Sequence, residues 1–320
     1  MHPALSAEDV WVLVCTYRRP ELLARLLRSL EREGVRHLIL VDNAPTPDAR
    51  PILDDCFPSG AYIHQPKPGL VRARNTSLDA VPAEASAVIF LDDDETVDPG
   101  WFDALLACAR ASSADAVSGP VVADFDGPEP EWISTYGFVR RTDRPTGPGP
   151  KRLATNNTLV RAKWFAPASR GGLGLRFHAA FNTVGGEDSD LFDRLREAGA
   201  VFWWCAEAAA TEHVPAERAT REWLRSRALR GGHVRALKRR LRTAPTVAGT
   251  VRVSLSIGAE GAARALYGAL RRTRARLGPR QVTYTDDYYL CEGVGMLASL
   301  IGRGREEYAR PAADEPPTRP

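Results

Sequence analysis

Residues 88–95 constrain the fold of this chain most strongly, because four apolar residues run directly into four acidic ones: Val-Ile-Phe-Leu-Asp-Asp-Asp-Glu. The apolar half is short and rich in β-branched and aromatic side chains, as is typical of a buried strand in a parallel sheet. The acids would then lie at the carboxyl end of that strand, at the sheet edge where open α/β proteins bind ligands. A divalent cation would compensate the repulsion between these carboxylates. Taken alone, the acids are equally compatible with a solvated turn.

Apolar segments and helical patterns alternate along the chain around this run. The first pair is an apolar segment at 10–15 and a helical pattern that begins at Pro20 and stops at Gly34. Proline suits the first turn of a helix, and glycine suits its end. Strands that alternate with helices predict a doubly wound α/β sheet. The expected strands are residues 10–15, 37–41, 61–64, 88–92, 116–122 and 201–204, and the polar loop within 154–160 leads into a further strand.

Polar residues follow three of the expected strands: Thr16-Tyr17-Arg18, Asp42-Asn43 and Asp92-Asp93-Asp94. In a parallel sheet these three ends share one edge, so the sequence predicts that they line one crevice. The first strand is not followed by Gly-x-Gly-x-x-Gly, and the chain has no Gly-Lys-Ser/Thr. These absences argue against a dinucleotide-binding enzyme and against a P-loop NTPase.

Two later segments carry further polar residues. Gly185-Gly186-Glu187-Asp188 precedes a helical pattern, so its acids lie near a helix N-terminus, where the helix dipole favours negative charge. A simple N-cap role for Asp188 or Asp190 is the alternative. Glu212-His213 follows the last expected strand, although a lone histidine is more often structural than a ligand.

Charge is distributed unevenly over the 320 residues. Residues 216–280 hold 17 Lys and Arg against three acids, whereas the whole chain has a net charge of only +3. Arginines interleave there with apolar residues at helical spacing, and further helical patterns cover 258–277 and 285–301. This cationic surface has three interpretations: a solvated face, contact with an anionic membrane surface, or contact with nucleic acid, of which the last is the least favoured.

These patterns predict an α/β domain over residues 1–215, a basic α-helical region over 216–309 and a disordered, Pro-rich tail over 310–320. No apolar run reaches the roughly 18 residues that a membrane span needs. The five scattered cysteines are typical of free thiols in a reducing compartment. The expected location is therefore the cytoplasm, with peripheral contact at the inner face of a membrane as an option.

Taken in order, the motifs in residues 10–230 resemble the inverting, nucleotide-sugar-dependent glycosyltransferases of family 2. The nearest likeness is to the bacterial exopolysaccharide subgroup that includes succinoglycan glucosyltransferases. The resemblance implies a GT-A fold, a Rossmann-like sheet sandwiched by helices, here with an α-helical C-terminal extension. It rests on Val14-Cys15-Thr16-Tyr17-Arg18-Arg19-Pro20, Val41-Asp42-Asn43, Gly69-Leu70-Val71-Arg72-Ala73-Arg74-Asn75, Phe90-Leu91-Asp92-Asp93-Asp94-Glu95, Gly185-Gly186-Glu187-Asp188 and Val214-Pro215-Ala216-Glu217-Arg218.

The resemblance also implies roles for residues that would bind the donor. Thr16, Tyr17 and Arg18 would pack on the base and ribose, and Asp42 would accept a hydrogen bond from the base. Arg74 would neutralise the diphosphate. The Asp-x-Asp pair would hold Mn²⁺ or Mg²⁺, with Asp94 as the direct ligand and Asp92 at the ribose or the metal. Asp93, between them, is included among the donor-binding residues.

The catalytic base implied by the resemblance is Asp188, with Glu187 as the second choice. A third metal ligand would come from His213, although the neighbouring Glu212 competes for that role. The expected reaction moves a sugar from a UDP-sugar, or another nucleoside-diphosphate sugar, to a hydroxyl of a saccharide, lipid-linked glycan or small molecule. Two alternatives stay open: a nucleotidyltransferase with a similar sheet, and a non-enzymatic nucleotide- or polyanion-binding protein.

Overall fold

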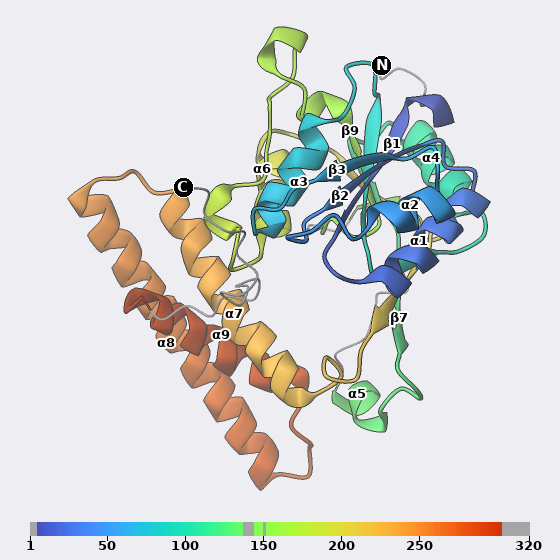
Figure 1. Cartoon of the computed structure of the whole chain (residues 1–320). Coiled ribbons are helices and arrows are strands. Elements are labelled where there is room, and N and C mark those ends of the chain that lie inside the picture. Colours follow the sequence, from blue (N-terminus) through green and yellow to red (C-terminus); the bar gives the residue numbers. More distant parts are fainter. Residues whose placement is uncertain (1–4, 137–143, 150–151, 303–320) are drawn as a thin grey trace.

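A computed structural model describes residues 5–136, 144–149 and 152–302 (Figure 1). The tail expected to be disordered, 310–320, lies outside the described residues. The strands are β1 (Val10–Thr16), β2 (His37–Asp42), β3 (Ala61–His64), β4 (Ala87–Asp92), β5 (Glu95–Val97), β6 (Ala116–Ser118), β7 (Val121–Phe125), β8 (Gly147–Pro148), β9 (Thr158–Arg161), β10 (Phe202–Trp204) and β11 (Ala210–Val214). The α-helices are α1 (Pro20–Arg32), α2 (Arg50–Cys56), α3 (Leu70–Asp79), α4 (Trp101–Ser112), α5 (Glu131–Tyr136), α6 (Glu187–Glu197), α7 (Arg221–Leu241), α8 (Val247–Leu277) and α9 (Tyr284–Leu300).

The main sheet has the strand order β3-β2-β1-β4-β9-β6-β10-β8. The strands β1, β2, β3 and β4 are parallel, and Thr16 lies beside Asp42 while Cys15 lies beside Asp92. The three polar strand ends therefore share one edge, as the sequence predicts. The sheet is mixed rather than purely parallel, because β9 runs antiparallel to both of its neighbours.

The expected single strand at 116–122 is two strands in different sheets. Between them, Gly119 approaches the neighbouring chain so closely that a Cβ atom there would lie 1.9 Å from the carbonyl oxygen of Ala208. Pro120 follows and has no N–H to donate to a ladder. The chain consequently leaves the main sheet after β6 and enters a small sheet with the order β5-β11-β7.

Helices cover both faces of the main sheet. Because successive side chains of a strand point to opposite faces, each buried strand contributes to two apolar cores. In β1, Val12 and Val14 pack with α1 and α4 in one apolar core, whereas Leu13 packs with α3 and α6 in a second core. The helix α1 has leucines at four buried positions, Leu23, Leu26, Leu27 and Leu30. This arrangement is the predicted sheet sandwiched by helices.

The C-terminal region is helical, as expected, and consists of α7, α8 and α9. Helix α8 is longer than its pattern predicts and begins at Val247. Helix α9 packs closely against both α7 and α8, which contact each other less extensively. Glycines allow this: a Cβ at Gly293 would lie 2.4 Å from the backbone of Ala265 in α8, and one at Gly295 would lie 1.9 Å from Leu229 in α7. No described helix is both long and apolar enough to cross a membrane.

Much of the cationic charge in this region is neutralised within the bundle. Helix α9 carries three buried acids, Asp286, Asp287 and Glu292. Arginines from α7 and α8 form ion pairs with them, including Arg225 with Asp287 at 2.7 Å and Arg271 with Asp286 at 2.7 Å. The charge count over residues 216–280 does not reveal this pairing, since the three acids lie outside that range. Many arginines of the basic region therefore pair with buried acids, so the region is not a uniformly cationic face.

We expect Asp286 to stabilise the bundle in a pH-dependent way. Burial raises its pKa, but hydrogen bonds from the Thr283 backbone and from Arg280 and Arg271 outweigh that effect and lower the pKa to about 2. The unfolded chain titrates near pH 4, roughly the ordinary value. The stabilisation is thus complete above about pH 4 and is lost as the pH falls towards 2. Asp286→Asn should lower the free energy of unfolding by about 2–4 kcal/mol at pH 7 in urea titrations, with a difference that shrinks below pH 4. A difference independent of pH would contradict this role.

Candidate active site

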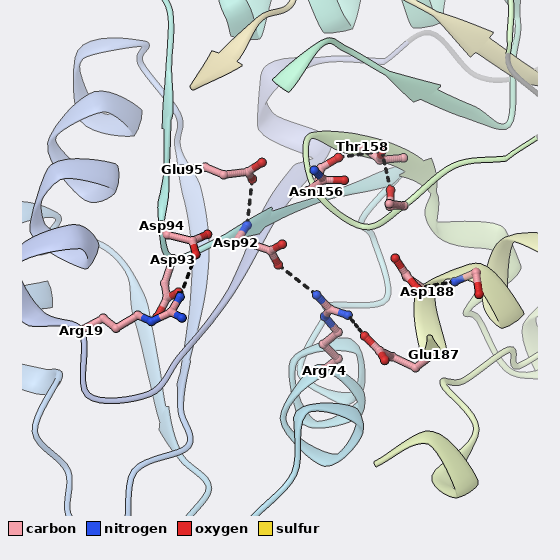
Figure 2. Close-up of polar contacts among 12 residues, drawn as sticks. Arg19, Arg74, Asp92, Asp93, Asp94, Glu95, Asn156, Thr158, Glu187 and Asp188 are labelled. Atoms are coloured by element: carbon pink, nitrogen blue, oxygen red, sulfur yellow. Dashed lines mark hydrogen bonds and ion pairs between the residues drawn. The ribbon is translucent and has the colours of Figure 1, made fainter. Parts of the chain in front are cut away.

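A cavity of about 970 Å³ lies over the carboxyl ends of β1 and β4. One wall is the sheet edge, with Thr16, Asn43 and the acids that follow β4. The opposite walls come from the N-terminus of α6 and from α7 and α9. Figure 2 shows Asp92 and Glu187 on the two sides of Arg74, with Asp188 next to Glu187 at the start of α6. The cavity thus unites segments that are more than 200 positions apart in the sequence.

The four acids that follow the apolar run are not equivalent. The chain turns sharply after Asp92 to start β5, and the turn is closed by Glu95, whose side chain accepts a hydrogen bond from the Asp92 N–H at 2.9 Å. Glu95 is 1% exposed, whereas the Asp92 side chain is 43% exposed. Burial raises the pKa of Glu95 well above its ordinary value. Glu95 therefore shapes the turn, and Asp92 faces the cavity.

Asp93 connects the acidic turn to the loop after β1. Its carboxylate accepts hydrogen bonds from the Thr16 hydroxyl at 2.8 Å and from the Arg19 guanidinium at 2.8 Å. Burial raises the pKa of Asp93 to about 6, although Arg19 opposes the shift. This geometry favours a structural role for Asp93 and Thr16, which hold the first loop against the turn. Their contact with a donor stays a prediction.

Asp94 lies between two arginines for which the sequence suggested no role. Arg19 contacts its carboxylate at 2.9 Å and Arg218 contacts it at 3.5 Å. Burial raises the pKa of Asp94, and the charge of Asp92 adds to this effect. Both arginines belong to motifs that carry the family resemblance, which is the signal that could have revealed them. Their cationic heads show that this position attracts positive charge.

Arg74 bridges the two sides of the cavity. The residue comes from α3 and is 8% exposed, and its guanidinium donates to Asp92 at 2.9 Å and to Glu187. The ring of Phe177 supports the guanidinium at 5.7 Å. Arg74 therefore holds a fixed cation beside the Asp-x-Asp turn, as diphosphate binding would require. Binding itself stays a prediction.

The two acids at the start of α6 have different surroundings. Glu187 is buried and paired with Arg74, and burial raises its pKa. Asp188 is half-buried, lines the cavity, and accepts a hydrogen bond from the Ser189 N–H at 2.5 Å. Gly186, at φ 86°, lets the chain enter the helix in this direction. Both acids line the cavity, but only Glu187 is paired with Arg74, so the geometry favours Asp188 as the acid that would meet a substrate. Its role as the base stays a prediction.

Two residues predicted to bind the nucleotide lie away from the cavity. The Asp42 carboxylate is buried, and it accepts hydrogen bonds from the backbone N–H groups of Ala44 and Ala49 and from the Tyr62 hydroxyl, each at 2.9 Å. Arg18 has a positive φ of 52°, and its guanidinium lies over the Tyr17 ring at 5.6 Å. Tyr17 lines the cavity, but neither Asp42 nor Arg18 does. This position favours a loop-holding role for Asp42, and its contact with a base stays a prediction.

Glu212 and His213 are successive residues of β11 and therefore point to opposite faces. Glu212 lines the cavity and lies beside Glu95, whereas the His213 imidazole lies 3.4 Å from Asp126. The geometry thus favours Glu212 over His213 at the cavity. The role of His213 as a metal ligand stays a prediction.

Within the described residues, no three His, Cys, Asp or Glu side chains are grouped closely enough to hold a metal ion by themselves. Mg²⁺ and Mn²⁺ need no such cage, because one or two carboxylates and substrate phosphates commonly hold them. Asp92 and Asp94 supply two hard oxygen donors at the edge of the cavity. Each carboxylate already attracts a cationic side chain, since Arg74 contacts Asp92 and Arg19 contacts Asp94. The donor set therefore fits a cation of this class.

Side chains from the C-terminal helices form a cavity wall that the sequence did not predict. Trp223 and Arg227 come from α7, and Tyr284 and Tyr288 come from α9. The Arg227 guanidinium lies 5.3 Å from the centre of a Trp223 ring. These residues occupy ordinary positions in amphipathic patterns, so nothing in their spacing marks them as cavity residues. Trp132 and Trp204 also line the cavity.

Comparison with known proteins agrees with this architecture. Residues 11–172 match the glycosyl transferase family 2. The succinoglycan biosynthesis protein ExoM of Rhizobium meliloti is 39% identical over 230 residues, covering 68% of this chain and 71% of that protein.

Solved structures show the fold. The crystal structure of S. aureus TarS 1-349 matches with a TM-score of 0.50 and 14% identity over 92% of each chain. The crystal structure of GalNAc-T7 with UDP, GalNAc and Mn²⁺ matches with a TM-score of 0.50 and 12% identity, over 64% of this chain and 44% of that one. These findings decide against the nucleotidyltransferase and non-enzymatic alternatives. The chain belongs to glycosyl transferase family 2, and it is a glycosyltransferase with a GT-A fold and a helical C-terminal region.

Proposed function

We propose that this glycosyltransferase inverts configuration as it moves a sugar from a nucleoside-diphosphate sugar, with UDP as the favoured nucleotide, to a hydroxyl acceptor. The observation that carries the proposal is the arrangement in Figure 2, where Asp92 and Asp188 lie on the two sides of Arg74 at one cavity. Carboxylates that would hold a cation, a fixed guanidinium and an accessible carboxylate can together support such a displacement.

On the donor side, Asp92 and Asp94 would hold Mn²⁺ or Mg²⁺ together with the donor diphosphate. When bound, the cation would stabilise the negative charge of the departing nucleoside diphosphate. Arg74 stays beside the same phosphates because Glu187 and Asp92 fix its guanidinium. Tyr17 and Asn43 line the part of the cavity next to β1 and β2, where the nucleoside would lie.

On the acceptor side, Asp188 takes the proton of the attacking hydroxyl. The new bond forms between that oxygen and the anomeric carbon as the bond from the anomeric carbon to the phosphate oxygen breaks. Attack and departure occur on opposite faces, so the configuration inverts. Asp188 suits this role because it is half-buried and its carboxylate has no arginine partner among the described ion pairs.

The acceptor would lie against the wall built by Trp223, Tyr284 and Tyr288, because aromatic faces pack well on sugar rings. A saccharide is therefore the acceptor class that we favour, including a saccharide linked to a lipid in polysaccharide synthesis.

The five cysteines are free, as in proteins of a reducing compartment. We accordingly place the reaction in the cytoplasm, with peripheral contact at an anionic membrane through residues 216–280.

A thermal-shift screen of nucleoside diphosphates, with and without Mn²⁺, tests this proposal. We expect UDP with Mn²⁺ to raise the melting temperature by several degrees, because a ligand at about 100 times its Kd stabilises a protein by about 2.7 kcal/mol. UDP alone and Mn²⁺ alone should each give a smaller shift. A shift with heparin but with no nucleoside diphosphate would contradict the proposal.

A further inference from the structure

Helix α8 presents an exposed apolar face. Of the 13 large apolar side chains that are exposed among the described residues, seven lie on this helix. Leu255 is 69% exposed, Leu266 is 63% exposed and Leu270 is 61% exposed. Isolated apolar residues are common on surfaces, but a concentration on one helix indicates a contact surface.

These side chains share one side of the helix. At 100° per residue, six of them fall within an arc of roughly 140°, and three exposed alanines share that arc. The opposite face packs against α9 through buried residues that include Val253 and Ile257. The six are Val247, Val251, Leu255, Leu266, Leu270 and Leu277, and the alanines are Ala248, Ala259 and Ala262. Since α8 has 31 residues, the apolar face extends over about 46 Å.

Cations lie along the edges of this face. Arg252, Arg274 and Arg276 are exposed, and none of them forms an ion pair with an acid in the described part of the chain. The only acid of α8, Glu260, points inward and is held by Arg235 and Arg264. The outer face of α8 is therefore mostly apolar, has arginines at or near its edges, and carries no acid.

This charge pattern distinguishes between two possible occupants. A second copy of the chain would place arginines against arginines with no acid between them, which costs free energy. An anionic membrane surface would instead accept the leucines between its lipids and attract the arginines to its headgroups. Figure 1 shows α8 on the side of the helical layer away from the sheet, so the face is open to such a surface.

We propose that the outer face of α8 is a docking surface for an anionic lipid membrane, on which the helix lies in the plane of the interface. The outer face of α8 is a more specific site for the membrane contact in the proposed function. Only the reason for that contact, access to a lipid-linked acceptor, rests on the proposed function. The contact thereby moves from the basic region as a whole, many of whose arginines are paired, to one helix face.

Vesicle flotation of the full chain tests the inference. We expect binding to vesicles of phosphatidylglycerol and phosphatidylcholine in equal parts, with much weaker binding to phosphatidylcholine alone. The L266E/L270E variant should reduce the partition coefficient by at least about tenfold. The matched control is Leu173→Glu, since Leu173 is 58% exposed and lies far from α8 in the sequence. R252Q/R274Q/R276Q should bind more weakly, by roughly fivefold per arginine.

Equal binding of wild type, L173E and L266E/L270E would overturn the inference, and so would the absence of wild-type binding. A wild-type dimer that becomes a monomer in L266E/L270E, without vesicle binding, would identify the face as a self-association surface instead. Circular dichroism and melting temperature check that each variant is folded. The vesicle assay contains no sugar donor, so it does not depend on catalysis. A chain that binds vesicles but transfers no sugar would therefore contradict only the proposed function.

Discussion

Asp188→Asn is expected to lower kcat by about 10²–10⁴, because the acceptor hydroxyl would lose the carboxylate that takes its proton. Asparagine has nearly the same shape, so the entry into α6 and the Ser189 contact should survive. The donor site should also survive, since the proposed function places Asp188 on the acceptor side. The thermal shift that UDP and Mn²⁺ produce should therefore match that of wild type. Steady-state release of UDP from a UDP-sugar measures kcat.

Asp193→Asn is the matched control for this prediction. Asp193 lies on the same helix and forms ion pairs with Arg196 and Lys238, outside the cavity. We expect its turnover to stay within a few fold of wild type. If Asp188→Asn retained full turnover, the assignment of Asp188 as the base would be wrong, and Glu187 would become the candidate to test.

Asp94→Asn is expected to lower kcat/KM by about 10³, because the variant would lose one of the two carboxylates that hold the cation at the departing diphosphate. Mn²⁺ should no longer increase the thermal shift produced by UDP. Arg19 and Arg218 would each lose a partner, but Asp93 still holds Arg19. The fold should therefore persist. Isothermal titration of Mn²⁺ in the presence of UDP measures the loss directly.

Asp98→Asn controls for the loss of an acid in this segment, because Asp98 is exposed and does not line the cavity. Its Mn²⁺ affinity and turnover should match those of wild type. An unchanged Mn²⁺ response in Asp94→Asn would place the cation elsewhere, for example with Glu212. That outcome would leave the glycosyltransferase activity in place and would correct only the metal assignment.

The sheet edge could be predicted from the sequence because local patterns determine it. Short apolar runs ending at Thr16, Asp42 and Asp92 specify parallel strands, and the geometry of a parallel sheet then brings their ends together. The sequence also predicts the strand that ends the loop at 154–160, but not that β9 runs antiparallel between β4 and β6, because that depends on a long-range pairing. The break between β6 and β7 depends on the close approach of Gly119 to Ala208, which no local pattern records.

The candidate site was partly predictable for a similar reason. The resemblance supplied Asp94, Arg74 and Asp188, and all three line one cavity. It could not show that Asp42 is enclosed by its own loop, since that depends on which backbone N–H groups the carboxylate meets. Nor could it show that α7 and α9 form a wall, because Trp223 looks the same in a buried or a cavity-lining helix. The net charge of residues 216–280 could not show how many of the arginines are paired, because most of their acidic partners, on α6 and α9, lie outside that range.

The anomeric configuration of the first sugar product tests the central claim most directly. The chain, at high concentration with Mn²⁺, would be mixed with UDP-sugars of α configuration, and water would serve as the acceptor. Proton NMR would then follow the first minutes of the reaction, before the released sugar equilibrates. We predict that the β anomer appears first and that removal of the metal with EDTA stops UDP release. Initial appearance of the α anomer, or UDP release that EDTA leaves unchanged, would contradict the account.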